Sequence, residues 1–198
     1  MSISLSKGQT ISLSKDQGLS RVFMGCGWDP AQPPQKGGLL GKIFGGSKAA
    51  EEIDLDASVI VFDGNKRKLD TVWFRQLQSS DGSIRHSGDN LTGEGDGDDE
   101  IIHVNLAGLD PDAHYLAFTV NSFRGQTFNE VDNAFARLVD ETTGKEICKY
   151  ALREQGPHTG VIMASMTRTA SGWQLTAYGR PTNGRTAEDL AAVAAAVL

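Results

Sequence analysis

The sequence predicts a mainly β protein, a β-sandwich with one short helix at its C-terminal end. Two observations lead to this fold class. Short runs rich in β-branched and aromatic residues recur along the chain with turn signals between them, and helical periodicity is confined to the end. The 198 residues, 39% of them hydrophobic, suffice for a substantial core, so we expect a single domain over residues 1–198.

The N-terminal region contains a short repeat, in which ISLSKGQ (3–9) returns as ISLSKDQ (11–17). In each copy isoleucine and leucine alternate with polar residues, which is the period of a strand. Residues 7–10 offer a turn between the copies, so we expect a hairpin or a bent strand here.

The middle of the chain alternates between strand-like runs and turns. Single strands are predicted at 56–63, 71–77, 100–106 and 114–123, and hairpins at 134–140 with 146–152 and at 161–169 with 173–179. The stretch 31–50 breaks this rhythm with a proline pair and two glycine pairs, so we interpret it as an irregular insertion.

The last residues are typical of a helix. Thr186 followed by Asp189 resembles a capping box, in which two side chains satisfy free N–H groups at the helix start. Apolar residues then follow at helical spacing, at Leu190, Val193, Ala194 and Val197.

Composition excludes several classes of protein. The net charge of −6 comes from one stretch, because residues 89–100 hold 6 of the 25 acidic residues and the remaining 19 balance the 19 lysines and arginines. A basic stripe for nucleic acid is absent, as is any run near the roughly 20 apolar residues of a membrane span. Two distant cysteines, Cys26 and Cys148, predict small buried residues in a reducing compartment, so a cytoplasmic protein is expected.

The acidic stretch GDNLTGEGDGDDE (88–100) raises a physical question, because its crowded carboxylates repel one another. A hard divalent cation removes the repulsion, and calcium takes six to eight oxygen ligands. The candidate ligands in this stretch are Asp89, Asn90, Thr92, Glu94, Asp98, Asp99 and Glu100. The stretch has no cysteine or histidine, which argues against zinc, and its spacing departs from an EF-hand loop.

A second group of acids lies upstream in IDLDAS. Asp54, Asp56 and Ser58 occupy alternate positions, so they share one face of a strand with Cα atoms roughly 6.6 Å apart. Two carboxylates at this spacing reach one ion or two adjacent ions. Asp29, in GWDP, is a further candidate ligand.

These motifs carry a family resemblance. GWDP, DLDAS and HSGDNLTGEGDGDDE, with GQTF and NAF further on, resemble the TerD family of bacterial tellurium-resistance and stress proteins over nearly the whole chain. DTVWFRQLQSSDGS and VNSFRGQTF are most similar to its TerZ branch. The resemblance implies a calcium-binding sandwich of two antiparallel sheets acting in the response to tellurite and other stresses. It assigns metal ligation to Asp29, Asp54, Asp56, Asp89, Asn90, Asp98, Asp99 and Glu100. The expected partners are other tellurite-resistance or stress proteins, with a membrane-associated complex as one setting.

Two classes of function remain open. In the first, the chain is a calcium-dependent binding or scaffold module and not an enzyme, with no catalytic residue. In the second, a divalent ion held by the acidic clusters activates water for hydrolysis. The sequence lacks a G-x-S-x-G elbow and a P-loop, which favours the first class. His86 precedes the acidic stretch, whose negative charge favours its protonated form.

Overall fold

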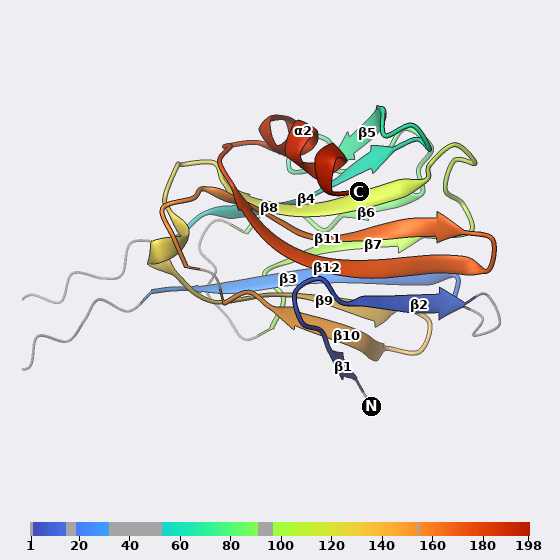
Figure 1. Ribbon diagram of the computed structural model, residues 1–198, viewed down its shortest axis with the longest axis horizontal. Helices are drawn as coiled ribbons and strands as arrows, with labels where there is room; N and C mark the ends of the chain where they lie inside the picture. Colours follow the sequence, from blue (N-terminus) through green and yellow to red (C-terminus); the bar gives the residue numbers. More distant parts are fainter. Residues whose placement is uncertain (1, 15–18, 32–52, 91–96, 154) are drawn as a thin grey trace, which may run out of the picture.

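The computed structural model describes residues 2–14, 19–31, 53–90, 97–153 and 155–198. Within these ranges the strands form two stacked sheets, here named sheet A and sheet B (Figure 1). Sheet A has the order β1 (Ile3–Ser4), β10 (Lys145–Ala151), β9 (Val131–Asp140), β3 (Arg21–Pro30), β7 (Glu100–Asn105) and β6 (Ile84–His86). Sheet B has the order β2 (Thr10–Ser14), β12 (Gly172–Thr182), β11 (Gly160–Thr169), β8 (Tyr115–Ser122), β4 (Leu55–Phe62) and β5 (Lys68–Val72). The predicted β-sandwich is confirmed.

The pairing between neighbouring strands is antiparallel almost throughout. In the described residues the exception is β1, which pairs with β10 in parallel over two residues. The main hydrophobic cluster draws on both sheets and includes Val22 and Leu138 from sheet A with Val59 and Leu116 from sheet B, all fully buried. The long strands contribute alternate side chains to this cluster, because successive residues point to opposite faces.

The outer face of sheet B is covered by helix α2 (Ala187–Val197), which lies at the top of Figure 1. Leu190 and Ala194 of the helix form a second buried cluster with Ile60, Phe62 and other residues of the sheet. Strand β4 is consequently buried on both faces along its whole length. The helix also confirms the predicted capping box, because Thr186 accepts a hydrogen bond from the Asp189 N–H while the Asp189 carboxylate caps in return.

The strands with local partners were predictable from the sequence. The two predicted hairpins correspond to β9 with β10 and β11 with β12, which pair with each other in antiparallel register. The predicted strands 56–63, 100–106 and 114–123 correspond to β4, β7 and β8 within one or two residues at each end. Strand β6 and the 3-10 turn η2 (Phe128–Glu130) are too short to leave a periodic signal.

Strand β3 was not expected, although it is the centre of sheet A. Its sequence RVFMGCGWDP contains two glycines, which usually weaken a strand. The structure shows why glycine is needed, because other parts of the chain approach the backbone of β3 closely at both positions. A Cβ atom on Gly25 would lie 2.3 Å from the Asp98 carboxylate, and one on Gly27 would lie 2.5 Å from the Phe135 ring. Side chains from the acidic segment and from β9 occupy the space that the glycines leave.

Of the two alternatives predicted for the N-terminal repeat, a hairpin or a bent strand, the hairpin was wrong. The two copies of the repeat belong to different sheets, because β1 pairs with β10 in sheet A and β2 pairs with β12 in sheet B. Gly8 between them adopts φ of 80°, a left-handed conformation that suits glycine, as the chain crosses from one sheet to the other. The repeat therefore closes one edge of both sheets.

The predicted strand 71–77 was also wrong beyond its first two residues. Strand β5 ends at Val72, and Trp73 and Gln76 then exchange two backbone hydrogen bonds of 3.1 and 2.9 Å across a tight turn. Trp73 and Phe74 pack edge to face, and Arg75 lies over both rings, so aromatic contacts account for the residue types that imitate a strand. The predicted insertion at 31–50 lies outside the described residues except for Ala31.

A candidate cation site at the start of strand β4

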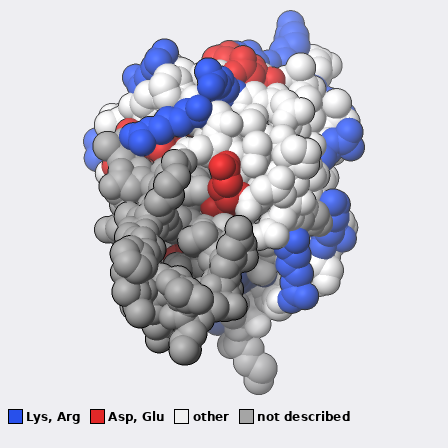
Figure 2. Space-filling view, turned by 90° about the vertical axis from the view of Figure 1, so that its left-hand side faces the viewer, with Lys and Arg blue, Asp and Glu red and all other residues white. Residues whose placement is uncertain are grey.

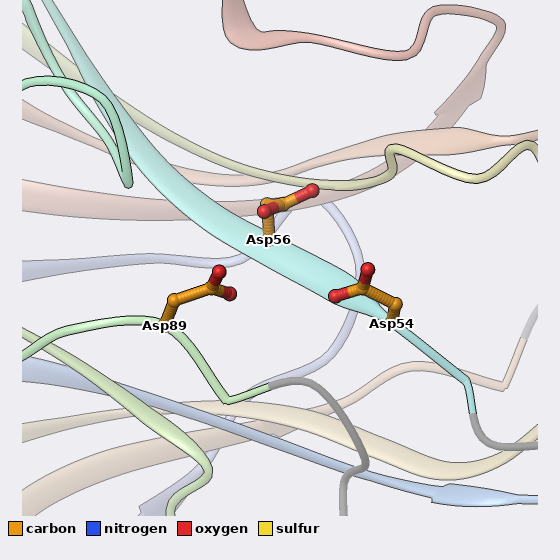
Figure 3. Close-up of side chains that lie close together, drawn as sticks. All are labelled: Asp54, Asp56 and Asp89. Atoms are coloured by element: carbon orange, nitrogen blue, oxygen red, sulfur yellow. The ribbon is translucent and has the colours of Figure 1, made fainter.

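Three aspartates meet at the end of the sandwich where β4 begins. Asp54 directly precedes β4, Asp56 is its second residue, and Asp89 comes from the segment between β6 and β7. One carboxylate oxygen of each lies within 4.8 Å of the others, and the side chains converge from the two segments (Figure 3). We call this group the aspartate triad.

Local backbone geometry explains how the triad forms. Asp54 and Asp56 point to the same side because side chains alternate along a strand, as the sequence predicted. Gly88 adopts φ of 118°, which an L side chain rarely adopts, and this turn brings the next residue, Asp89, against β4. Asp54 and Asp56 are 6% and 3% exposed, whereas Asp89 is exposed and forms the solvent side of the triad.

The triad concentrates negative charge in a buried place. Burial and then the charges of Glu100, Asp54 and Asp89 raise the pKa of Asp56 to about 8. Burial also raises the pKa of Asp54, although the neighbouring Arg124 partly offsets the effect. A raised pKa means that these carboxylates hold their charge at a cost, and a bound cation removes that cost.

Several buried oxygens near the triad have no hydrogen-bond donor among the described residues. Asp54 Oδ1, Asn121 Oδ1 and Ser58 Oγ are all in this state. Asn121 lies opposite Asp56 in the register of β8 with β4, and its amide nitrogen donates to Asp56 Oδ2 at 3.4 Å and to the Arg185 carbonyl at 2.8 Å. Buried polar atoms are nearly always paired, so unpaired oxygens beside three carboxylates indicate a place for a cation.

The end of the acidic stretch is arranged differently. Asp98 forms a two-pronged ion pair with Arg137 of β9, at 2.7 Å to Nε and 2.8 Å to Nη2. Asp99 accepts hydrogen bonds from the Trp28 backbone N–H at 2.8 Å and from the Asn90 side chain at 3.0 Å. Both carboxylates are expected ligands whose oxygens already have donors from this chain.

Glu100 joins the two sheets. Its side chain is 1% exposed and accepts hydrogen bonds from the backbone N–H groups of Ala57 at 2.6 Å and Asn90 at 3.1 Å. Ala57 lies in the part of β4 that precedes its pairing with β5, which begins at Val59. A side chain from sheet A therefore bonds the backbone edge of sheet B beside the triad.

His86 lies beside Glu100 and completes this arrangement. Its Nε2 lies 3.0 Å from the Ala57 carbonyl and 3.3 Å from Glu100, while its Nδ1 accepts a hydrogen bond of 3.1 Å from the Gly88 N–H. Burial lowers the pKa of His86, and Glu100 more than offsets this and raises it. The net direction agrees with the expectation from the sequence that nearby acids favour the protonated form.

The other expected ligands lie apart from the triad or outside the described residues. Asp29 accepts a hydrogen bond of 2.8 Å from the Asn133 side chain and lines a cavity of about 510 Å³ with Phe135, Lys149 and others. Thr92 and Glu94 fall in the stretch 91–96, which the structure does not describe. Figure 2 views this end of the molecule and shows exposed acidic atoms in small separate patches, with lysine and arginine around the periphery.

Sequence reasoning missed two residues at the site. Asn121 contributes a buried oxygen, and the Arg124 Nε lies 3.0 Å from Asp54 Oδ2. The signal for Asn121 was present, because its polar amide lies in a strand that was predicted to be buried on both faces. Arg124 left no local signal, since its partner is 70 positions away.

The cysteines match the sequence interpretation as buried residues. Cys26 and Cys148 are both free and are 2% and 1% exposed. Burial, followed by the charges of Glu100 and the neighbouring aspartates, raises the pKa of Cys26 far above its usual range, and burial raises that of Cys148 to about 12. Neither thiol is activated as a nucleophile, because the reactive form is the thiolate.

Together these features define a class of protein, a two-sheet β-sandwich with a cluster of aspartate carboxylates at one end. The TerD domain model matches residues 1–195, and the chain belongs to the TerD family. Tellurium resistance protein TerZ of Serratia marcescens is 53% identical over 189 residues, which cover 95% of this chain and 94% of the relative. Stress response protein SCP2 of Bacillus subtilis is 40% identical, with 96% and 98% of the two chains covered.

A solved structure supports the fold assignment. The crystal structure of a homologue of telluride resistance protein TerD from Streptomyces coelicolor superposes with a TM-score of 0.67, covering 88% of this chain and 96% of the other at 23% identity. The predicted membership of the TerD family is confirmed, and the chain is similar to a TerZ protein, as the sequence predicted. None of the helices in the described part of the chain has the length and apolar character needed to cross a bilayer.

Proposed function

We propose that this protein binds calcium through the aspartate triad and acts as a calcium-dependent binding or scaffold module in tellurium resistance and the stress response. Its relatives are named for tellurium resistance and for stress response, which supports the biological setting. The proposal of a binding module, with no catalytic role, goes beyond those names. Its proposed partners are other proteins of the same response.

The observation that carries the proposal is the convergence of three aspartates around buried oxygens that have no donor among the described residues. Asp54, Asp56 and Asp89 would hold the ion, with Asn121 Oδ1 as a neutral ligand nearby. Carboxylate and amide oxygens suit calcium, whereas zinc prefers nitrogen and sulfur. Magnesium demands a stricter octahedral geometry and gives up its water reluctantly, so calcium is the expected ion.

The hydrolase alternative has no support from the relatives, which carry names of resistance and stress proteins. The chemistry around the triad also favours binding. Arg124 is the cation that pairs with the triad in the described structure, and it bonds the carboxylate that would hold the metal. Thus, the described site offers ligands for an ion but no separate group placed to act on a substrate.

Calorimetric titration of calcium into metal-stripped protein tests the proposal. Asp89→Asn is the most informative variant, because Asp89 is exposed and its loss leaves the core intact. We expect it to weaken calcium binding at least tenfold, which corresponds to about 1.4 kcal/mol. Asp112→Asn changes an equally exposed aspartate in the turn between β7 and β8 and is the matched control. Equal losses in both variants, or no binding by the unmodified protein, would contradict a site at the triad.

Asp98→Asn separates two versions of this proposal. The family resemblance assigns Asp98 a ligand role, whereas in the structure its carboxylate is paired with Arg137. If the metal-bound state keeps that pair, Asp98→Asn lowers stability and leaves calcium affinity nearly unchanged. A loss of affinity as large as that of Asp89→Asn would show that Asp98 leaves Arg137 to join the ion.

A further inference from the structure

Arg124 extends from the segment after β8 to the aspartate triad. Its Nε lies 3.0 Å from Asp54 Oδ2, and the Arg124 side chain is 49% exposed while that of Asp54 is 8% exposed. The Arg124 side chain therefore pairs with a buried carboxylate while about half of its surface stays in solvent. It bonds one oxygen of Asp54, and the other oxygen, Oδ1, is buried with no donor among the described residues.

The backbone that carries Arg124 is fixed. The Gly125 N–H donates to the Ser122 carbonyl and to its hydroxyl, at 3.2 and 3.1 Å, and the Gln126 N–H also donates to that hydroxyl at 3.0 Å. Arg185 Nη2 donates to the Arg124 carbonyl at 3.1 Å, and Gly125 takes φ of 87° to make the turn. The side chain alone is left to move between the triad and solvent.

A guanidinium held in this way competes with a metal ion for the same carboxylate. The three aspartates carry up to three negative charges, and Arg124 neutralises one of them. Because Arg124 belongs to the same chain, it is present at the site at an effective concentration that is about millimolar or higher, whatever the surrounding solution contains.

We propose that Arg124 is a built-in counter-ion that calcium displaces from Asp54, and that this exchange excludes monovalent cations from the site. The inference rests on the calcium-binding function proposed above. A monovalent ion that replaces Arg124 exchanges one positive charge for one, and gains nothing electrostatically. A divalent ion adds a net positive charge to a group of buried carboxylates, which offsets the loss of the Arg124–Asp54 ion pair.

Calcium titrations of Arg124→Gln test the inference. Removing the competitor should tighten calcium binding about two- to fivefold, the range expected for a partly exposed ion pair. Arg67→Gln is the matched control, because Arg67 also pairs with an aspartate, Asp63, through Nε at 2.8 Å. Its calcium affinity should equal that of the unmodified protein.

Monovalent competition gives a second measurement. At constant ionic strength, replacing choline chloride with potassium chloride should weaken calcium binding by Arg124→Gln at least twofold and leave the unmodified protein unchanged. A third measurement uses the unmodified protein and does not depend on how a variant folds. The Arg124 side-chain Nε–Hε resonance should move toward the position of a free guanidinium as calcium is added.

The outcomes separate this inference from the proposed function. If the unmodified protein does not bind calcium, both the proposed function and this inference are overturned. If the unmodified protein binds calcium but Arg124→Gln binds equally or less tightly, or the Arg124 resonance stays in place, only the displacement of Arg124 is overturned. Equal sensitivity of both proteins to potassium would overturn the selectivity.

Discussion

The carboxylates at this end of the molecule fall into two groups that differ in what satisfies them. Asp98 and Glu100 accept hydrogen bonds from donors of the chain itself, a guanidinium and backbone N–H groups. The aspartate triad, in contrast, brings carboxylates together around a buried oxygen that has no donor in the described part of the chain. Crowded acids are thus tolerated in two ways, with donors from the protein or with a cation from solution.

The comparison has a consequence for stability. A carboxylate satisfied by the chain stabilises the fold without any ion, so its removal should destabilise the metal-free protein. Asp56 of the triad is held against repulsion, so its neutralisation should stabilise the metal-free protein and abolish the stabilisation that calcium gives. The two groups should therefore respond with opposite signs.

The largest effect is expected at Glu100. Glu100→Ala leaves the buried Ala57 N–H without its acceptor and removes the carboxylate beside His86, so we expect a loss of about 3–5 kcal/mol in the free energy of unfolding of the metal-free protein. Urea unfolding monitored by circular dichroism measures it. Glu141→Ala is the matched control, because Glu141 also pairs with a histidine, His103, at 2.8 Å but at the surface. It should cost less than about 1 kcal/mol, and a similar loss in both variants would contradict the role of Glu100 in joining the sheets.

An effect of opposite sign is expected at Asp56. Asp56→Asn keeps an oxygen that accepts the hydrogen bond from Asn121 while it removes a buried charge, so the metal-free protein should gain about 1–2 kcal/mol at pH 8. With calcium at 100 times its dissociation constant, the unmodified protein should gain about 2.7 kcal/mol and the variant nothing. Thermal unfolding with chelator and with calcium measures both changes. Destabilisation of the metal-free variant would place Asp56 with the carboxylates that the chain satisfies.

The smallest effect is expected at Asp81, which lies between β5 and β6 and is not part of the triad. Burial raises the pKa of Asp81, but hydrogen bonds from Ser79, Ser83 and the Asp110 N–H outweigh this and lower it to about 2. A depressed pKa contributes stability above the unfolded value near 4, and this contribution is lost as the pH falls toward 2. Because Asp81 is exposed, we expect Asp81→Asn to cost only about 1 kcal/mol at pH 7.

The pH dependence checks the sign of the Asp81 effect. Urea unfolding at pH 7, 5 and 3 should show a difference between the unmodified protein and Asp81→Asn that is constant from pH 7 to 5 and smaller at pH 3. A difference that grows as the pH falls would mean that the carboxylate is held at a cost, as in the triad.

The parts of the fold that follow from neighbouring residues were predictable. Hairpins such as β9 with β10 need only alternating residues and a turn, and the capping box of α2 lies within four residues. Strand β3 escaped prediction because Gly25 and Gly27 serve contacts with the distant Asp98 and Phe135. The pairing partners of β1 and β2 could not be predicted either, since these partners are distant in the sequence.

The candidate site shows the same limit. Strand alternation was enough to place Asp54 and Asp56 together, and composition was enough to single out the acidic stretch. Which acids already have donors depends on Arg137 of β9 and on backbone N–H groups of β3 and β4, which no local pattern specifies. The calcium ligands expected in the sequence therefore remain a prediction, now concentrated on the triad.

The division of the N-terminal repeat between two sheets also bears on protein synthesis. Ser14 in β2 pairs with Gly172 in β12, and Ile3 in β1 pairs with Cys148 in β10. At about 5–20 residues per second, the ribosome takes roughly 8–30 s to make the chain between β2 and its partner. During that interval two strands with apolar faces have nothing of their own to pair with. The repeat is therefore open to aggregation or chaperone capture until β10 and β12, its partners, have been made.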